Sequence, residues 1–223
     1  MAKLTVGIPV YEGVDQIDVA APWDVLGRIT KYYPKLNVEL LLIGQTGDPV
    51  HSGQGLVFTP QVSFEDCPKL DVLLVPGTQT LDAIVPNTRY IKFLKRRGKQ
   101  ARYVVSVCTG AVLLAEAGLL DGHRATTHWA ALDRLRGYKN VTVANGYPRW
   151  VDCGNRMTTG GVSASIDGAL HLTERLTGDA SVAQCIQLEI QYNPRAPYAG
   201  GDPAVADFET YETVMGVKSP ACR

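Results

Sequence analysis

The sequence has no excess of charge of either sign, because its 22 Lys and Arg residues balance 22 Asp and Glu residues. A general nucleic-acid binder, or a protein held on anionic lipid, needs a positive field that this chain does not provide. The sequence also lacks an apolar run near the roughly 18 residues of a membrane span, and it opens without a signal-peptide core. We therefore expect a cytoplasmic protein that binds neither nucleic acid nor membranes.

The sequence contains no CxxC pair, and its five cysteines are an odd number that cannot all pair within one chain. It has only four histidines, and no cysteine or carboxylate lies at ligand spacing beside His123 and His128. We therefore expect reduced thiols, and we predict neither a metal site nor a cofactor.

The sequence does have enough apolar residues for one core, since 45% of its 223 residues are hydrophobic. Short β-rich runs alternate with segments of helical period, which is typical of a parallel sheet with helices on both faces. We expect an α/β fold. The predicted strands are 4–10, 38–43, 71–75, 103–107, 124–127 and 141–143, and the predicted helices are 15–30, 81–85, 90–99, 110–117, 130–135, 165–176 and 181–192.

Three segments differ from this alternation. Residues 48–64 and 151–158 combine turn residues with short β-formers, which predicts two hairpins, the first attached to the sheet. The segment 194–223 begins with a stretch rich in Pro, Gly and Ala, and we expect it to extend over the surface or onto a partner subunit. No change in composition marks a boundary, so residues 1–223 are predicted to form a single domain.

The strongest chemical signal is the segment VSVCTGAVLL at 105–114, where an apolar strand passes into a helix. A residue at such a junction makes a tight reversal that presents its side chain at the carboxyl edge of the sheet. The helix dipole and free amides favour a thiolate, so we expect the pKa of Cys108 to lie below the ordinary ~8.5. We predict Cys108 as a nucleophile. The other cysteines are interpreted as inert, and they are Cys67, Cys153, Cys185 and Cys222.

At these residues the chain resembles the DJ-1/PfpI superfamily, also called ThiJ/PfpI, and in particular its isonitrile hydratase branch. The matching segments are QIDVAAPWDVL at 16–26, SVCTG at 106–110, AGLLDG at 117–122, RATTHW at 124–129, GGV at 160–162 and ID at 166–167. The resemblance implies a flavodoxin-like three-layer sandwich, related to class I glutamine amidotransferases. It also implies a homodimer whose active sites lie near the subunit interface.

The resemblance assigns roles to two positions beside the nucleophile. The acidic residue that approaches the sulfur falls on Asp18; many relatives carry Glu there, and Asp fits the isonitrile hydratase branch better. Thr109 follows the cysteine where a peptidase-like branch has histidine, so a Cys–His protease is disfavoured for lack of an adjacent base. From the residues alone, Asp18 is equally well explained as a charge or cap at the start of a helix.

The predicted oxyanion hole departs from the family pattern. Relatives commonly have Pro-Gly-Gly after the preceding strand, whereas this chain has Pro76-Gly77-Thr78. Because Thr resists positive φ, either the loop differs locally or the Thr78 amide donates from an ordinary conformation. The amide of Thr109, at the helix start, is expected to point at the site.

The matching segments also supply candidate pocket residues. Two glycines in one loop let the backbone come close to substrate or to Cys108. His128 is more simply explained as a histidine satisfied by hydrogen bonds inside the fold, and Trp129 as a core or pocket-wall residue. The full set is Gly77, His128, Trp129, Gly160, Gly161 and Val162.

A thiol and a carboxyl that share one proton suit the hydration of an organic isonitrile. Cys108 would add to the terminal carbon while Asp18 protonates it, and water would convert the thioimidate into an N-substituted formamide. This predicts a cofactor-independent carbon–nitrogen lyase of the hydro-lyase type. Two alternatives are open at this point: carbonyl detoxification of the glyoxalase or deglycase type, and a non-enzymatic cysteine redox sensor related to domains of AraC-type regulators.

Overall fold

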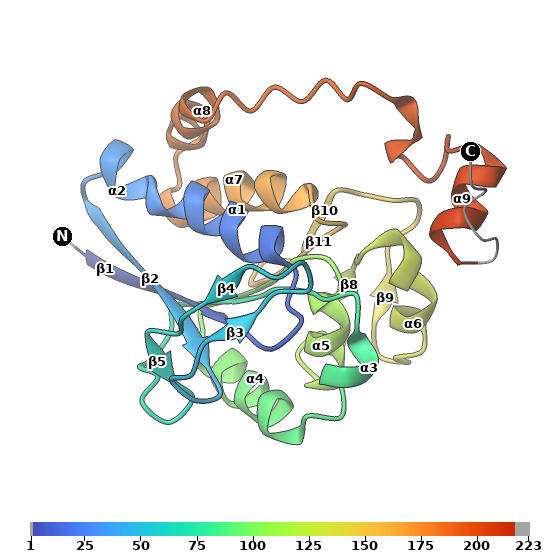
Figure 1. Cartoon of the computed structure of the whole chain (residues 1–223). Coiled ribbons are helices and arrows are strands. Elements are labelled where there is room, and N and C mark those ends of the chain that lie inside the picture. The colour runs from blue at the N-terminus through green and yellow to red at the C-terminus, as the bar shows by residue number, and fades with distance from the viewer. Residues whose placement is uncertain (1, 217–223) are drawn as a thin grey trace.

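The structure, a computed structural model, describes residues 2–216 and is built on a seven-stranded sheet (Figure 1). All neighbouring strands run parallel except the pair at one edge of the sheet, which forms an antiparallel hairpin and stands first in the spatial order below. In spatial order the strands are β10 (Trp150–Asp152), β11 (Arg156–Thr159), β7 (Tyr103–Ser106), β6 (Val72–Val75), β1 (Ala2–Pro9), β2 (Leu36–Gly44) and β5 (Val62–Ser63).

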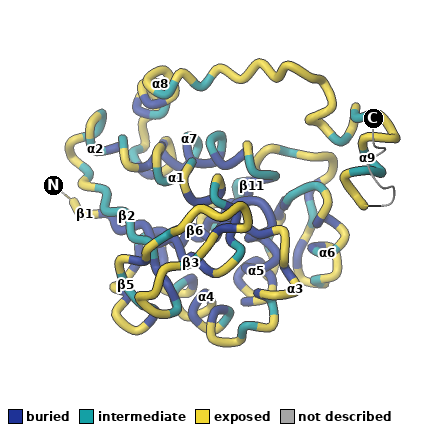
Figure 2. Tube along the Cα trace, in the orientation of Figure 1, coloured by how far each residue is buried: buried dark blue, intermediate teal, exposed yellow. Residues whose placement is uncertain are grey.

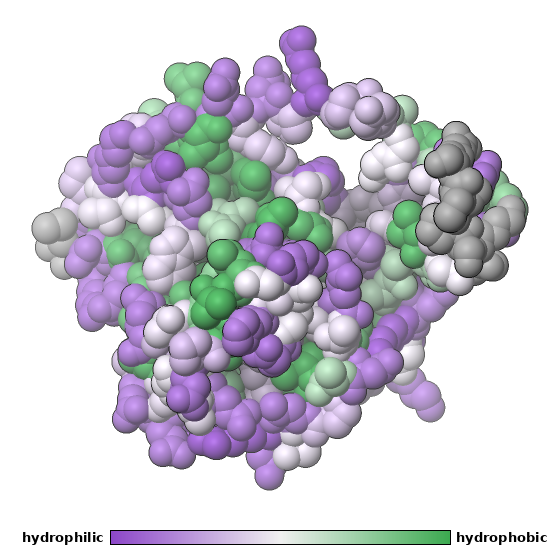
Figure 3. Space-filling model, viewed as in Figure 1, coloured by the Kyte–Doolittle hydropathy of each residue, from purple (hydrophilic) through white to green (hydrophobic). Residues whose placement is uncertain are grey.

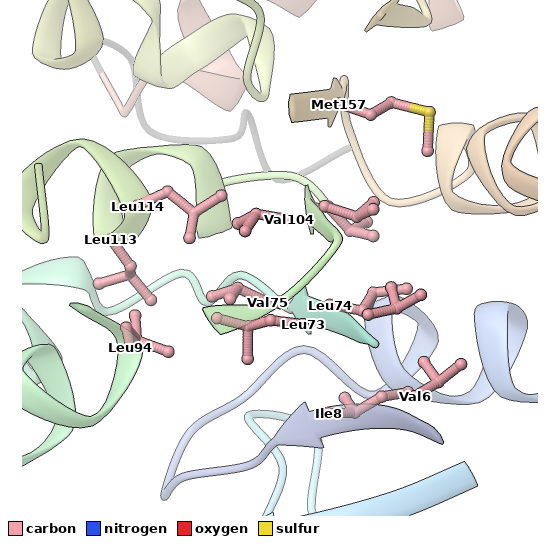
Figure 4. Packing of buried hydrophobic residues seen from close by; sticks show 14 of the residues in the cluster. Val6, Ile8, Leu73, Leu74, Val75, Leu94, Val104, Leu113, Leu114 and Met157 are labelled. Atoms are coloured by element: carbon pink, nitrogen blue, oxygen red, sulfur yellow. The ribbon is translucent and has the colours of Figure 1, made fainter. Parts of the chain in front are cut away.

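The centre of the sheet is buried on both faces, which explains the continuous apolar runs in its strands. Side chains of β1, β6 and β7 pack against those of the adjoining helices in one cluster (Figure 4). Val6, Leu73 and Val104 have no exposed surface. The carboxyl ends of these three strands therefore meet at one rigid edge, which is where ligands bind in α/β sheets.

Helices cover both faces of the sheet, so the predicted α/β sandwich is confirmed (Figure 1). On one face lie α1 (Gln16–Gly27), α2 (Ile29–Tyr32), α7 (Ala164–Thr177) and α8 (Ala180–Glu189); on the other lie α3 (Leu81–Ile84), α4 (Thr88–Gln100) and α5 (Gly110–Glu116). The helix predicted over 15–30 is two helices in the structure. At the end of α1, a hydrogen bond between residues three apart, from Arg28 N–H to Val25 O, tightens the last turn and ends the helix.

The first predicted hairpin is only partly correct. β3 (Val50–His51) and β4 (Val57–Phe58) form an antiparallel pair of their own, and only β5 joins the central sheet, parallel to β2. The runs predicted at 124–127 and 141–143 pair with each other as β8 (Arg124–Ala125) and β9 (Thr142–Val143). Runs this short carry too little apolar surface to specify which sheet they join.

The C-terminal segment stands apart from this core. After α8 the chain crosses to the side where η1 (Trp129–Ala131) and α6 (Leu132–Arg136) lie, passing through η2 (Ala199–Gly201) to α9 (Phe208–Val214) (Figure 1). Most of this segment is exposed (Figure 2), and in the space-filling view it bridges an open gap before it meets the body again (Figure 3). Its contact with the body is therefore concentrated at α9.

Residues 2–216 contain neither a helix that could span a membrane nor a cluster of metal-binding side chains. No helix in this part of the chain is long and apolar enough to cross a membrane. No group of three or more His, Cys, Asp or Glu residues within the same range is arranged to hold a metal ion. The thiols of Cys67, Cys108, Cys153 and Cys185 are free, and Cys222 lies outside the described residues.

Candidate active site

Cys108 lies in a strained turn between β7 and α5, as the sequence predicts for a nucleophile elbow. Its φ is +55°, a left-handed conformation that a residue other than glycine rarely adopts. Two hydrogen bonds hold this backbone in place: Cys108 N–H donates to Gly160 O at 3.0 Å, and Thr127 Oγ1 donates to Cys108 O at 2.8 Å. The loop after β11 and the segment after β8 thus fix the turn from outside.

Gly110 allows α5 to start close to the neighbouring strand. A Cβ at this position would collide with the carbonyl oxygen of Val75, at the end of β6. Because that collision is with backbone, no side-chain rotation would relieve it. The glycine therefore sets how closely the elbow approaches the edge where β6 and β7 end.

Asp18 is fully buried in the first turn of α1. Its Oδ2 accepts a hydrogen bond from Gly77 N–H at 2.9 Å, while Oδ1 has no partner of regular hydrogen-bond geometry among the described residues. The cap of the helix is Asp15, whose Oδ1 accepts from Ile17 N–H at 3.2 Å. The interpretation of Asp18 as a helix cap is therefore wrong, and its carboxyl is free for another role.

Burial and the nearby Asp15 carboxylate raise the pKa of Asp18 to about 8. Hydrogen bonds from the Gly77 amide and from the Cys108 thiol lower this pKa and only partly offset the rise. Asp18 is therefore mostly protonated at neutral pH. Oδ2 accepts a hydrogen bond from the Gly77 amide, so Oδ1 is the oxygen available to carry the carboxyl proton.

The expected low pKa of Cys108 is wrong. Burial raises the pKa of this thiol first, and the Asp18 and Asp15 carboxyls raise it further. Hydrogen bonds from Thr109 lower it, which fits the expectation that the amide at the start of α5 points at the sulfur. The cost of desolvating a thiolate exceeds this help, so the resting pair is a thiol beside a carboxylic acid.

The Thr78 amide does not face open space in this structure. Thr78 N–H donates to Thr109 Oγ1, and that hydroxyl donates back to Thr78 O, both at 2.7 Å. In the described part of the chain, the residues other than glycine with positive φ are Cys108 and Gln191. Thr78 is not one of them and has an ordinary φ. Thr78 therefore has an ordinary backbone conformation, but its amide donates to Thr109 and not into the cavity.

Gly77 keeps this corner open. A Cβ there would lie 2.5 Å from Thr109 Oγ1 and 3.0 Å from Asp18 Oδ2. Contacts this close would displace either the hydroxyl or the carboxyl, both of which are buried. Gly77, predicted as a pocket residue, lines neither of the two cavities described below but is needed where Thr109 and Asp18 converge.

A cavity of about 590 Å³ opens onto the Cys108 side chain. Among the predicted site residues, Cys108, Thr109, Thr78, His128 and Val162 line it. Trp129, Gly160 and Gly161 instead line a neighbouring cavity of about 510 Å³, which shares His128 and Val162. The predicted pocket is thus divided in two.

His128 separates the two cavities as a neutral side chain. Its Nδ1 accepts a hydrogen bond from Ala130 N–H at 3.3 Å, which assigns the ring proton to Nε2. Burial lowers the pKa of His128 and so keeps the ring uncharged at neutral pH. Gly161 leaves room for this ring, because a Cβ there would lie 2.7 Å from His128 Cδ2.

The sequence interpretation missed two groups of cavity residues. Asp15 lies three residues before Asp18 at a helix start, a pattern that signals a cap and could have drawn attention to it. The others include sequence neighbours of Thr78 and Trp129, which the motifs did not single out, and Val214, which comes from a remote segment with no local pattern. These are Gln79, Thr80, Leu81, Asp82, Ala130, Ala131, Arg134 and Val214.

The comparisons with known proteins agree with this geometry. The model of the DJ-1/PfpI family matches residues 4–175. The chain belongs to the DJ-1/PfpI family. A solved structure of a ThiJ/PfpI family protein from Pseudomonas syringae has a TM-score of 0.89 and 30% sequence identity, and it covers 97% of this chain and 86% of that chain. The flavodoxin-like fold implied by the resemblance is therefore confirmed.

Two relatives of different function differ in how much of their length they share with this chain. An isonitrile hydratase from Pseudomonas putida is 39% identical over 220 residues, which are 99% of this chain and 92% of that protein. The transcriptional regulator CdhR from Pseudomonas aeruginosa is 33% identical over 145 residues, which are 64% of this chain and 42% of that protein. Similarity to the hydratase therefore extends through the segment that follows the family match.

Proposed function

We propose that this protein is an isonitrile hydratase, which adds water to an organic isonitrile to give an N-substituted formamide. The observation that carries the proposal is the pairing of a protonated, buried Asp18 with Cys108 at a strained elbow. An isonitrile carbon must accept both a nucleophile and a proton, and this pair supplies the two from one site. Similarity to the Pseudomonas putida enzyme over nearly the whole chain supports the same reaction.

The reactive form is reached when the pair has lost one proton and the thiol proton of Cys108 has passed to the Asp18 carboxylate. This thiolate beside a protonated Asp18 is the minor arrangement of the remaining proton, because burial raises the pKa of the thiol. The sulfur forms a bond to the terminal carbon, and Asp18 transfers its proton from Oδ1 to the same carbon. The product of this step is a thioimidate on Cys108 and an ionised Asp18. The Gly77 amide, which donates to Oδ2, stabilises that carboxylate.

Hydrolysis then restores the enzyme. The Asp18 carboxylate takes a proton from water as the water oxygen bonds to the thioimidate carbon. The carbon–sulfur bond breaks, and the remaining hydroxyl proton passes to nitrogen. The formamide leaves, and the thiolate and the protonated carboxyl are regenerated without a cofactor.

Thr109 stabilises the nucleophile, and Thr78 holds the side chain of Thr109 in place. The Thr109 amide stabilises the thiolate at the start of α5, while the reciprocal hydrogen bonds with Thr78 hold the Thr109 side chain. An isonitrile has no carbonyl oxygen when it is attacked, so the first step needs no free Thr78 amide. Pocket residues such as His128 and Val162 bound the space for the substituent on nitrogen.

The alternatives receive less support. The regulator matches a smaller part of the chain at lower identity than the hydratase does, which disfavours a non-enzymatic sensor. Carbonyl detoxification would use the same thiol, but Asp18 stands where many relatives carry Glu. The hydratase therefore remains the proposed activity, in a cytoplasmic homodimer that binds neither membranes nor nucleic acid.

Product analysis tests the activity directly. The purified protein is incubated with an aromatic isonitrile and, separately, with methylglyoxal, with the Cys108→Ala variant as the control. We expect the N-aryl formamide from the isonitrile, no conversion of methylglyoxal, and neither reaction in the variant. Conversion of methylglyoxal without formamide would instead support carbonyl detoxification.

A further inference from the structure

Helix α9, at the end of the described chain, lies at the Cys108 cavity although it is remote from it in sequence. Val214 lines the same cavity as Cys108 and Thr109. One turn earlier, the Tyr211 ring lies 5.0 Å from the Trp129 ring, centroid to centroid. Because residues three apart lie on one face of a helix, both side chains belong to the face of α9 that meets the body.

The start of α9 is fixed by a side-chain cap within the C-terminal segment itself. Asp207 Oδ1 accepts from Thr210 N–H at 2.9 Å, and Asp207 Oδ2 accepts from Thr210 Oγ1 at 2.7 Å. The segment before α9 contributes as well, because Gly201 and Pro203 line the neighbouring cavity beside His128. The C-terminal segment thus borders both cavities.

The other walls of the Cys108 cavity suit an uncharged, apolar group. Leu81, Ala130, Ala131 and Val162 line it. The charged lining residues are Asp15, which caps α1 on the side of the cavity near Asp18, and Arg134 and Asp82, which form an ion pair of 2.6 Å with each other. A neutral hydrocarbon or aryl substituent therefore meets matching surface on the apolar side, and α9 bounds the cavity from the C-terminal segment.

From this arrangement we infer that α9 is a specificity wall: Val214, positioned by the Tyr211–Trp129 contact, limits the size of the group that can reach Cys108. The inference deepens the proposed hydratase activity, because the limited group is then the apolar substituent on the isonitrile nitrogen. A smaller residue at 214 enlarges the cavity, and a larger one reduces it. Neither change touches Cys108 or Asp18.

The wall can be tested without any isonitrile, by alkylating Cys108 with a small and a large reagent. Iodoacetamide and N-(1-pyrenyl)maleimide are compared on the full chain, and labelling is followed by mass spectrometry of the peptide that holds Cys108. We expect Val214→Ala to accelerate the pyrenyl reagent by ~10-fold and Val214→Trp to slow it by a similar factor, with iodoacetamide changed less than ~2-fold.

Val205 offers a matched control in the same segment. It is 65% exposed and is absent from the lining of the Cys108 cavity. Val205→Ala and Val205→Trp should leave both alkylation rates at the parent values. Equal rates in the Val214 and Val205 variants would overturn the inference, and so would equal changes for both reagents at Val214, since these indicate altered thiol reactivity rather than access.

A second measurement tests whether Val214 also limits the size of the isonitrile that is hydrated. The ratio of kcat/KM for a bulky and a small isonitrile should rise in Val214→Ala and fall in Val214→Trp. If the parent turns over neither isonitrile while the alkylation rates change as expected, the hydratase proposal fails and the wall stands. If both isonitriles are hydrated with an unchanged ratio in the Val214 variants, the wall fails and the hydratase proposal stands.

Discussion

The Cys108 cavity has a floor, formed at the edge of the sheet, and an outer wall, formed by α9, and the two differ in how far their residues are buried. The floor consists of strand ends and helix starts whose polar groups are buried and hydrogen-bonded, as at Thr78 and Thr109. Asp18 is buried next to this floor and accepts the hydrogen bond from the Gly77 amide. The wall comes from α9, where Val214 is 62% exposed. A buried floor can perturb pKa values strongly because it excludes water, whereas an exposed wall acts through shape. Within one cavity, the buried floor therefore carries the chemistry and the exposed wall selects substituents by size.

Loss of the nucleophile should have the largest effect. Cys108→Ala removes the sulfur that bonds to carbon, so isonitrile turnover should fall to the background rate while the fold is retained. Turnover is measured as formamide formation, and far-UV circular dichroism checks the fold. Cys185→Ala, at an exposed thiol, is the matched control and should keep the parent rate. Retained turnover in Cys108→Ala would place the chemistry outside the floor.

Removing the proton donor should have the next largest effect. Asp18→Asn keeps an oxygen for the Gly77 amide but can neither protonate carbon nor activate water, so turnover should fall by ~10²-fold or more. Cys108 should still be alkylated by iodoacetamide, and Asp18→Glu should keep part of the activity despite its extra methylene. Near-parent turnover in Asp18→Asn would shift the acid–base role to His128 or to a bound water.

The same substitution should change stability with a defined pH dependence. The folded chain holds the Asp18 proton up to about pH 8, whereas an unfolded chain releases it near pH 4, so the parent loses stability as pH rises between these values. Asp18→Asn has no such loss. Its free energy of unfolding should exceed that of the parent by several kcal/mol at pH 9, on the order of 1.4 kcal/mol per pH unit of the window, and match it near pH 4. Urea unfolding at both pH values measures the difference.

Burial has the largest effect on the pKa of Asp18, and the carboxylate of Asp15 should shift the pH range of the reaction further. Because the reactive pair has lost one proton, kcat/KM should rise with pH up to about 8. Asp15→Asn keeps a helix cap but removes the negative charge that raises the pKa of Asp18, so the rise should move to lower pH. Asp179→Asn, which makes the same change at the cap of α8, should leave the profile unmoved.

The smallest effect is expected at Thr78. Its amide already donates to Thr109, and the first step develops no oxyanion, so Thr78→Gly should reduce turnover by less than the ~10²–10³-fold typical of a lost oxyanion donor. The loss of turnover is measured as the change in kcat, on a variant whose circular dichroism spectrum matches that of the parent. A larger loss would mean that the floor includes a direct contact between this loop and the substrate.

Much of the fold could be predicted because its signals are local. Predominantly apolar runs at β1, β6 and β7 mark strands buried on both faces, and the strand, cysteine and glycine near residue 108 mark the elbow. Short pairings were harder to predict. β3, β4 and β8 have two residues each, and which partner they find depends on segments far along the chain.

The sequence by itself determined the layered sheet, the place of the nucleophile and, through family resemblance, its acidic partner. Only the tertiary structure decided the direction of the Cys108 pKa, because desolvation depends on every segment packed around the thiol. It likewise decided that Asp15, not Asp18, caps α1, and that Thr78 is engaged with Thr109. Val214 reaches the cavity from more than a hundred residues beyond Cys108, and only the folded chain brings the two together.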